Sequence, residues 1–218
     1  MFDGLPAFIL GNGPTLPVDD LGCLDGCFTV GVNRIVRVYE PTVLLWVDGS
    51  VYTDDSEDAR LIDEAESLKV CDQSVWQRQG WIGLKTWTGD NAVRHETTPT
   101  ELCCNGNTGC TAARWAIALG CNPVYLVGMC AKYQGTGEDL RTDFYGVNDR
   151  HHVAPLDDDV PTSITLHHMT TELTRLTRDF PDVKHIPFGD LLRDVAADCG
   201  GIDQDETRAK LRSLLGEV

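Results

Sequence analysis

The chain has 218 residues, 42% hydrophobic and 24% charged, which suits one globular domain with its own core and excludes a low-complexity protein. Its formal net charge of −16 disfavours tight binding to nucleic acid and to anionic membranes. Because no apolar stretch reaches the length of a membrane span and no signal-peptide pattern opens the chain, we expect a soluble, cytoplasmic protein.

The nine cysteines are scattered and odd in number, and no pair of C-x2-C motifs occurs. Structural zinc sites use such paired motifs, so we expect no zinc site. Most of the thiols are therefore expected to be reduced and partly buried, as in a reducing compartment.

Residues 8–10 form a short apolar run that ends in Gly11-Asn12-Gly13-Pro14. The run predicts a first buried strand, and the glycines allow backbone conformations and close approaches that a Cβ would prevent. Pro14 suits the first turn of a helix. A strand, a glycine turn and a helix start leave N–H groups free at the carboxyl edge of a sheet, which predicts a phosphate site. The motif is neither a complete Gly-x-Gly-x-x-Gly fingerprint nor a P-loop.

Two further strands are predicted, over 28–33 and 41–48, and each ends in a small polar side chain, Asn33 and Asp48. In an open parallel sheet, the strand ends on one side line the ligand crevice. Both residues are also common turn formers, so the two interpretations stay open here.

Residues 54–69 are acidic and place apolar side chains at helical spacing up to Leu68, which predicts an amphipathic helix. The tryptophan-rich segment 75–93 predicts short strands and turns at the sheet edge. Its tryptophans suit packing there better than stacking on a base or a sugar.

Asn107-Thr108-Gly109 is a capping sequence for an alanine-rich helix that ends at Gly120, and a buried strand follows over 124–128. A glycine-opened helix followed by a strand is typical of half a doubly wound sheet. The start of this helix would supply a second set of donors at the carboxyl edge.

The segment from about 130 to 165 lacks periodicity and contains Tyr133 and Tyr145. A stretch of this length is commonly a lid over a site. His167 and His168 then open the next predicted helix.

The last elements are a strand over 183–186, a helix that starts at 187–192 and a charged helix over 205–215. We predict an α/β fold in which residues 1–200 form one catalytic domain, with a doubly wound, mostly parallel sheet and a lid. Residues 201–218 would form a C-terminal tail helix on the surface.

Three motifs together resemble those of the bacterial lipooligosaccharide sialyltransferases. They are Gly-Asn-Gly-Pro-Thr-Leu at 11–16, Val-Asn at 32–33, and Asn-Thr-Gly-Cys-x6-Ile-Ala-Leu-Gly-x4-Tyr-Leu-x-Gly at 107–128. The pattern also resembles wider relatives: motility-accessory proteins that glycosylate flagellin, short phage-borne proteins and archaeal-type hydroxymethylpterin diphosphokinases. The similarity covers residues from about 7 to 195.

This resemblance implies a single Rossmann-like domain with a lid, which uses a cytidine monophosphate sugar as donor without a metal cofactor. The turn Gly11-Asn12-Gly13-Pro14 would meet the donor phosphate and ribose. Asn33 would contact the nucleotide, and Asp48 takes the place of a family asparagine. At the helix start, Asn107, Thr108 and Gly109 would contact the donor, the last two matching a family Ser-Gly.

The resemblance also implies roles for the lid and the helix after it. Tyr133 and Tyr145 would bind the phosphate of the leaving nucleotide, and His167 or His168 would be the catalytic base. A neutral histidine suits the deprotonation of an acceptor hydroxyl near pH 7. The family usually has Asp at the position of Cys130, a departure that bears on the sugar and the acceptor.

The sequence leaves other functional classes open. One is an ATP- and Mg²⁺-dependent diphosphotransferase of the hydroxymethylpterin diphosphokinase type, although the expected Asp/His-rich segments are missing. Another is a nucleotide-binding module without catalysis. A Mg²⁺ or Mn²⁺ site is a third alternative, at His151, His152, His167, His168 and 157–159.

The acceptor is expected to carry a hydroxyl group. Because short relatives occur in phages, a hydroxymethylated DNA base is one candidate, which the −16 charge disfavours. Many such sheets associate, so a homo-oligomer also stays open.

Overall fold

The computed structural model describes residues 2–53, 56–74, 78–88, 95–104, 106–130, 143–144, 154–155, 161–162, 164–187 and 189–216; of 154–155, 161–162 and 164–168 it describes the backbone only. Ten strands lie within these ranges. They are β1 (Ala7–Leu10), β2 (Phe28–Val32), β3 (Val43–Trp46), β4 (Leu68–Asp72), β5 (Ile82–Thr88), β6 (Glu101–Cys104), β7 (Val124–Val127), β8 (Ala154–Pro155), β9 (Pro161–Thr162) and β10 (Val183–Ile186).

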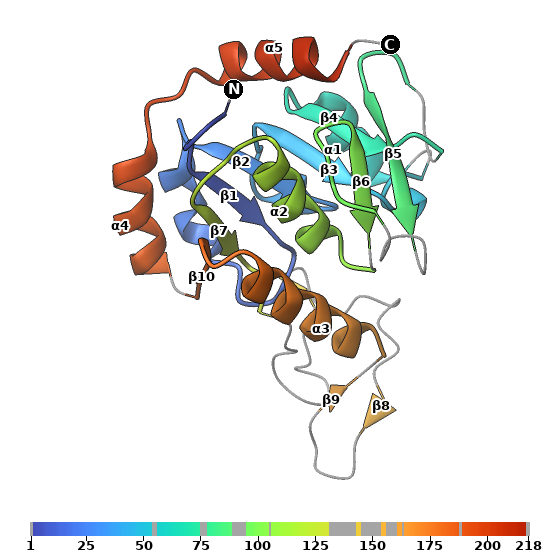
Figure 1. Ribbon diagram of the computed structural model, residues 1–218, viewed down its shortest axis with the longest axis vertical. Coiled ribbons are helices and arrows are strands. Elements are labelled where there is room, and N and C mark those ends of the chain that lie inside the picture. Colours follow the sequence, from blue (N-terminus) through green and yellow to red (C-terminus); the bar gives the residue numbers. More distant parts are fainter. Residues whose placement is uncertain are drawn as a thin grey trace.

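Eight of these strands form one sheet in the order β10-β7-β1-β2-β3-β4-β5-β6 (Figure 1), while β8 and β9 form a separate antiparallel pair. Every neighbouring pair in the eight-stranded sheet is parallel. The prediction of an α/β fold with a mostly parallel sheet is therefore confirmed.

The order of the sheet reverses at β1. Ala7 pairs with Phe28 of β2 on one side and with Val124 of β7 on the other. The chain runs outward from β1 to β6, crosses back, and adds β7 and β10 on the opposite side. In an open α/β sheet, ligands bind at the carboxyl ends of the strands at such a switch point.

Helices cover both faces of the sheet (Figure 1). The α-helices are α1 (Glu57–Glu64), α2 (Thr108–Ala118), α3 (Ile164–Asp179), α4 (Gly189–Cys199) and α5 (Gln204–Leu215), and the 3-10 helices are η1 (Val18–Leu24), η2 (Ile35–Arg37) and η3 (Gly49–Val51). One core contains side chains of α2, α3 and α5, and the other contains side chains of η1, η2, α1 and α4. The sheet is therefore doubly wound, as predicted.

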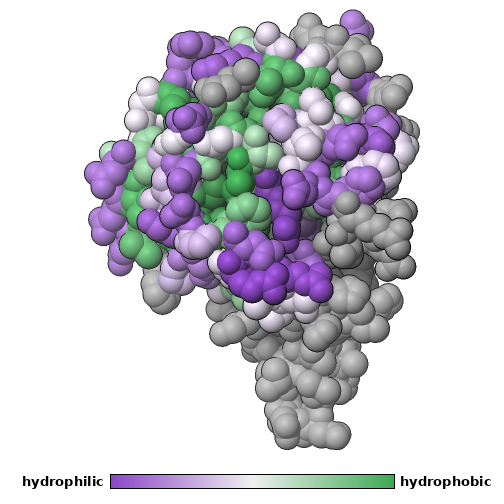
Figure 2. Space-filling model, in the orientation of Figure 1, coloured by the Kyte–Doolittle hydropathy of each residue, from purple (hydrophilic) through white to green (hydrophobic). Residues whose placement is uncertain are grey.

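Strand β1 contributes to both cores, since Ile9 packs on the α2 side and Phe8 and Leu10 pack on the other. Helix α2 crosses the centre of the first face and buries Ala112 and Ala113 completely. These small side chains let the helix lie close to the strands. On the same side of the molecule, the outward surface of α3 is hydrophilic (Figure 2).

Helix α5 confirms the helix predicted over 205–215. Its Leu211 is fully buried in the core with α2. At its start, Gln204 donates to the carbonyl oxygen of Cys27 at 2.8 Å and accepts from the hydroxyl of Thr42 at 2.5 Å. The helix is thus tied to the amino ends of β2 and β3.

The helix predicted over 54–69 is shorter in the structure, because α1 ends at Glu64 and Leu68 begins β4. Ser56 caps the start of α1, with its hydroxyl accepting from the amide of Ala59 at 3.0 Å. After the helix, the carboxylate of Glu40 accepts hydrogen bonds from the amides of Glu66 and Ser67. This contact fixes the turn that leads into the strand.

The tryptophan-rich segment contains β5, which lies between β4 and β6 rather than at the edge. Strand β6, of only four residues, is the edge strand on this side of the sheet and was not predicted. Among the described residues, no helix combines the length and the apolar character that a membrane crossing requires.

Candidate functional site

The turn after β1 packs backbone to backbone against the turn after β7. The amide of Gly11 donates to the carbonyl oxygen of Val127, and that of Gly13 to the carbonyl oxygen of Gly128, both at 2.8 Å. A Cβ built on Gly13 would lie 2.5 Å from the Gly128 oxygen, and one on Gly11 would lie 2.7 Å from it. Both positions therefore require glycine for close approach.

The prediction that Pro14 begins a helix is wrong. The amide of Leu16 donates to the carbonyl oxygen of Gly13 at 3.0 Å, so Pro14 occupies the second position of a β-turn. Proline is favoured there because its fixed φ matches the turn. The first helical residue that follows is Val18, in η1, so no α-helix starts at this turn.

Asn12 and Asn33 lie next to each other at the carboxyl ends of β1 and β2. The side-chain amide of Asn12 donates to the carbonyl oxygen of Val32 at 3.2 Å. Asn33 follows directly in a left-handed conformation, with φ of 52°, which asparagine tolerates well. The Oδ1 atoms of both are buried, and neither has a hydrogen-bond partner in the described part of the chain.

The start of α2 lies against the same turn. Asn107 caps the helix as predicted, with its Oδ1 accepting from the amide of Cys110 at 3.0 Å. Met129 packs between the two elements: a Cβ on Gly109 would lie 2.7 Å from its Cε, and one on Gly11 would lie 2.6 Å from its Cγ. The positive end of the α2 dipole, with Thr108 and Gly109, therefore faces this edge of the sheet.

Asp48 acts as a turn former in the structure. Its carboxylate accepts from the amide of Ser50 at 2.9 Å and caps η3. It lies two residues beyond β3, on the same edge of the sheet as Asn33. A role in ligand binding stays a prediction.

Helix α3 begins at Ile164, before the two histidines that were predicted to open it. The backbones of His167 and His168 lie in its first turns, and their side chains fall outside the described part of the structure. Further along, the buried carboxylate of Glu172 accepts from Arg114 of α2 at 3.5 Å and from Arg175 at 2.8 Å. This ion pair helps to fix α3 against α2.

Of the predicted lid, one described piece reaches the turn after β1. The amide of Phe144 donates to the backbone carbonyl of Asn12 at 2.8 Å, and its ring packs against the core that contains η1 and α4. Tyr133 and Tyr145 lie outside the described residues.

Sequence reasoning missed Met129 and His185. Met129 follows a predicted strand, but nothing local indicates that it packs against Gly109. His185 lies near the carboxyl end of β10, and desolvation by the surrounding protein lowers its pKa, an effect that the backbone of Met129 partly offsets. The sequence signal that could have found His185 is its place near the end of the predicted strand 183–186.

The described residues contain no group of three or more His, Cys, Asp or Glu side chains arranged to hold a metal ion. Of the metal site considered above, residues 151, 152 and 157–159 lie outside the described ranges.

No protein-family model and no curated protein sequence matches this chain. Among solved structures, it is similar to the MAf glycosyltransferase from Magnetospirillum magneticum AMB-1, with a TM-score of 0.54 and 14% sequence identity over 98% of this chain. The chain spans 38% of the length of that protein. At this identity the likeness shows a shared fold.

Proposed function

We propose that the chain is a glycosyltransferase that moves a sugar from a nucleotide-sugar, with a CMP-sugar favoured, to a hydroxyl acceptor. The observation that carries the proposal is the pair of buried Oδ1 atoms on Asn12 and Asn33, which have no partner among the described residues. Buried polar atoms usually have partners, so these two acceptors call for donors from a ligand. Ribose hydroxyls and the amino group of cytosine are such donors.

The surrounding backbone suits the phosphate of the same ligand. The amides of Gly11 and Gly13 already donate to Val127 and Gly128, so the start of α2, which favours a negative charge, would receive the phosphate. The likeness to the MAf glycosyltransferase supports the assignment to glycosyl transfer.

For the chemical step, we assign the general base to His167 or His168 on α3. The base would take the proton of the acceptor hydroxyl as its oxygen attacks the anomeric carbon of the sugar. Tyr133, Tyr145 and the start of α2 would stabilise the phosphate of the departing nucleotide.

A thermal-shift screen of CMP, UDP, GDP, ADP and ATP, each with and without Mg²⁺, tests the donor. A ligand that binds the native state raises the melting temperature by mass action. We expect CMP to do so without Mg²⁺. Stabilisation by ATP and Mg²⁺ alone would overturn the proposal in favour of a diphosphotransferase, and preference for UDP or GDP with metal would change the donor.

Asn33→Gly provides the matched variant, since glycine adopts the left-handed backbone but lacks the amide. We expect this variant to keep the melting temperature of the unliganded protein and to lose the shift caused by CMP. An unchanged shift would remove the observation on which the proposal rests.

Hydrolysis of a CMP-sugar, measured in His167→Ala and His168→Ala, tests the base. Loss of a general base lowers the rate by about 10²–10⁴-fold, and binding of CMP should persist. If neither variant loses activity, the base lies elsewhere, and His185→Ala is the next variant to measure. No hydrolysis by the unmodified protein under any condition would favour a binding module.

A further inference from the structure

Another site lies at the opposite edge of the sheet from the candidate site described above. It is a groove of about 620 Å³ at the amino ends of β4 and β5, below the C-terminal part of α5. Its lining includes three cationic and two acidic side chains together with an indole ring. These are Lys69, Arg78, Arg212, Asp63, Glu66 and Trp81.

Two of the cations lack a carboxylate partner in the described part of the chain. Lys69 donates to the backbone carbonyl of Ala65 and forms no ion pair, and Arg212 of α5 forms none either. Burial lowers the pKa of Lys69. The charges of Glu40 and Asp63 oppose this shift, and the smaller effects of Arg212 and Arg208 add to it. Two positive charges therefore lie near each other without an ion-pair contact of their own in the described part of the chain, although the carboxylates of Glu40 and Asp63 act on Lys69 from a distance.

The remaining charges of the groove have partners. Asp63 accepts from the hydroxyl of Tyr52 at 2.8 Å and from Arg78 at 3.3 Å. The guanidinium of Arg78 lies 4.6 Å from the centre of the Tyr52 ring and 5.8 Å from that of Trp81. Glu66 is largely exposed and lies 4.0 Å from Arg208.

We propose that this groove binds a doubly charged phosphate group between Lys69 and Arg212, either as free phosphate or as a small phosphate monoester. Arginine and lysine form strong charge-assisted hydrogen bonds to phosphate oxygens, and a dianion matches two cations that form no ion pair with the described residues. The volume lies in the range of small-molecule sites. In a chain of net charge −16, cations without partners at one place mark that place for an anion.

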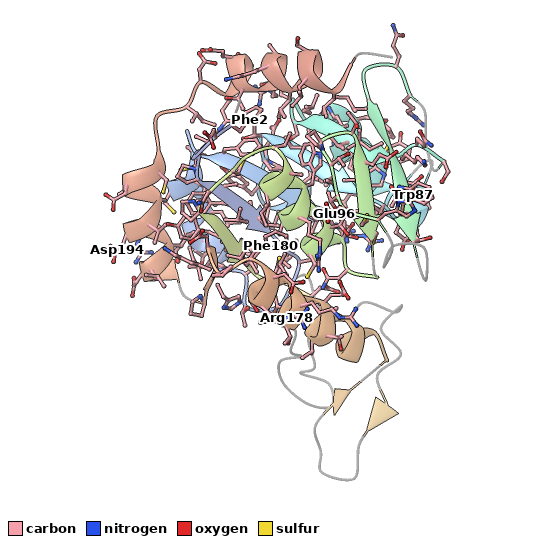
Figure 3. The ribbon with its side chains drawn as sticks, in the orientation of Figure 1. Phe2, Trp87, Glu96, Arg178, Phe180 and Asp194 are labelled. Atoms are coloured by element: carbon pink, nitrogen blue, oxygen red, sulfur yellow. The ribbon has the colours of Figure 1, made fainter. Side chains whose placement is uncertain are left out.

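Calorimetric titration of the full chain with inorganic phosphate, at constant ionic strength set with sodium chloride, tests the proposal. Arg212→Gln removes one phosphate ligand from a helix surface, and Lys69→Met removes the other. Lys210→Gln is the matched control: it removes a charge from the same helix, but its ammonium lies 5.3 Å from the ring of Phe2, beside α5 (Figure 3), and is not part of the groove.

We expect saturable binding to the unmodified protein and to Lys210→Gln, and a loss of affinity of at least about tenfold in Arg212→Gln and Lys69→Met. Absence of saturable binding overturns the proposal. Equal binding by Arg212→Gln also does so, because the phosphate would then bind elsewhere. If Lys69→Met does not fold, Arg212→Gln alone decides.

A parallel titration with phenyl phosphate distinguishes the two sources of the phosphate. Tighter binding than that of inorganic phosphate would identify a monoester whose organic part contacts Trp81. Equal or weaker binding would identify free phosphate.

Discussion

The amide of Gly13 donates a 2.8 Å hydrogen bond to the carbonyl oxygen of Gly128, and a side chain on Gly13 is incompatible with that contact. Gly128 itself has a φ of +66°, and a Cβ there would lie 2.8 Å from a side-chain carbon of Leu16. The turn after β1 and the turn after β7 therefore both depend on glycine.

Replacing Gly13 by alanine tests this dependence. The added Cβ would lie 2.5 Å from the Gly128 oxygen, so the turns must separate. We expect the free energy of unfolding in urea to fall by about 1–3 kcal/mol and the shift caused by CMP to disappear. Gly22→Ala is the control, because nothing lies within 4 Å of its added Cβ, and it should be neutral or stabilising. Equal stability of both variants would contradict the packing described.

Asn12→Ala separates ligand binding from stability. The substitution removes one hydrogen bond to Val32, which contributes about 0.5–1.5 kcal/mol, but also removes a buried acceptor without a partner. We expect a change of less than about 1 kcal/mol in stability and at least about a tenfold loss of affinity for CMP, measured by titration calorimetry. Unchanged affinity would exclude Asn12 from the nucleotide site.

Asp58 predicts how stability depends on pH. Burial alone would raise its pKa, but the hydrogen bonds and charges of Arg37 and Arg34, each 2.6 Å away, lower it overall. Its contribution to stability is therefore present above the unfolded-state pKa of about 3.9 and is lost as the pH falls through the lower folded-state value.

Unfolding of Asp58→Asn, measured from pH 7 to pH 3, checks this sign. We expect the variant to be less stable at pH 7 by about 1–3 kcal/mol and to lose less stability than the unmodified protein on acidification. Glu64→Gln breaks an exposed pair with Arg60 and should change stability by less than about 0.5 kcal/mol. Parallel pH curves for Asp58→Asn and the unmodified protein would contradict the ion-pair assignment.

The thiols should react in two groups. Burial raises the pKa of Cys71, Cys110 and Cys121 to about 12 and that of Cys27 to about 11. Because the thiolate is the reactive form, a disulfide reagent at pH 8 should leave these thiols unmodified in the native protein. We expect no more than the three partly exposed cysteines to react quickly, and all nine to react in denaturant. Rapid reaction of buried thiols would show that the native core opens readily.

Much of the fold could be predicted because its signals are local. Buried strands such as 124–127, the cap at Asn107 and the close glycine turn each depend on a few neighbouring residues. The end of α1 could not be predicted, because the Glu40 carboxylate that fixes the following turn lies 26 residues before Glu66. For Pro14, the same fixed φ suits a β-turn as well as a helix start.

The candidate site was predictable only in part, for the same reason. The strand ends at Asn12 and Asn33 could be assigned from sequence, but their contact requires β1 and β2 to be neighbours. The packing of Met129 between Gly11 and Gly109 requires the whole crossover from β6 to β7. Sequence does not specify such adjacency directly. The assignments of Tyr133, Tyr145, His167 and His168 stay predictions.

The two partners of β1 emerge at very different times during synthesis. β2 follows closely and can pair as soon as it leaves the ribosome, but β7 begins only at Val124. Until then β1 keeps an open edge, and the ring of Phe8 lacks the Tyr125 ring that stacks on it at 5.0 Å in the folded chain. Such an edge can pair with other chains, so the nascent protein is most prone to aggregation during this interval. The candidate site is therefore completed late in folding, when a long-range pairing closes the centre of the sheet.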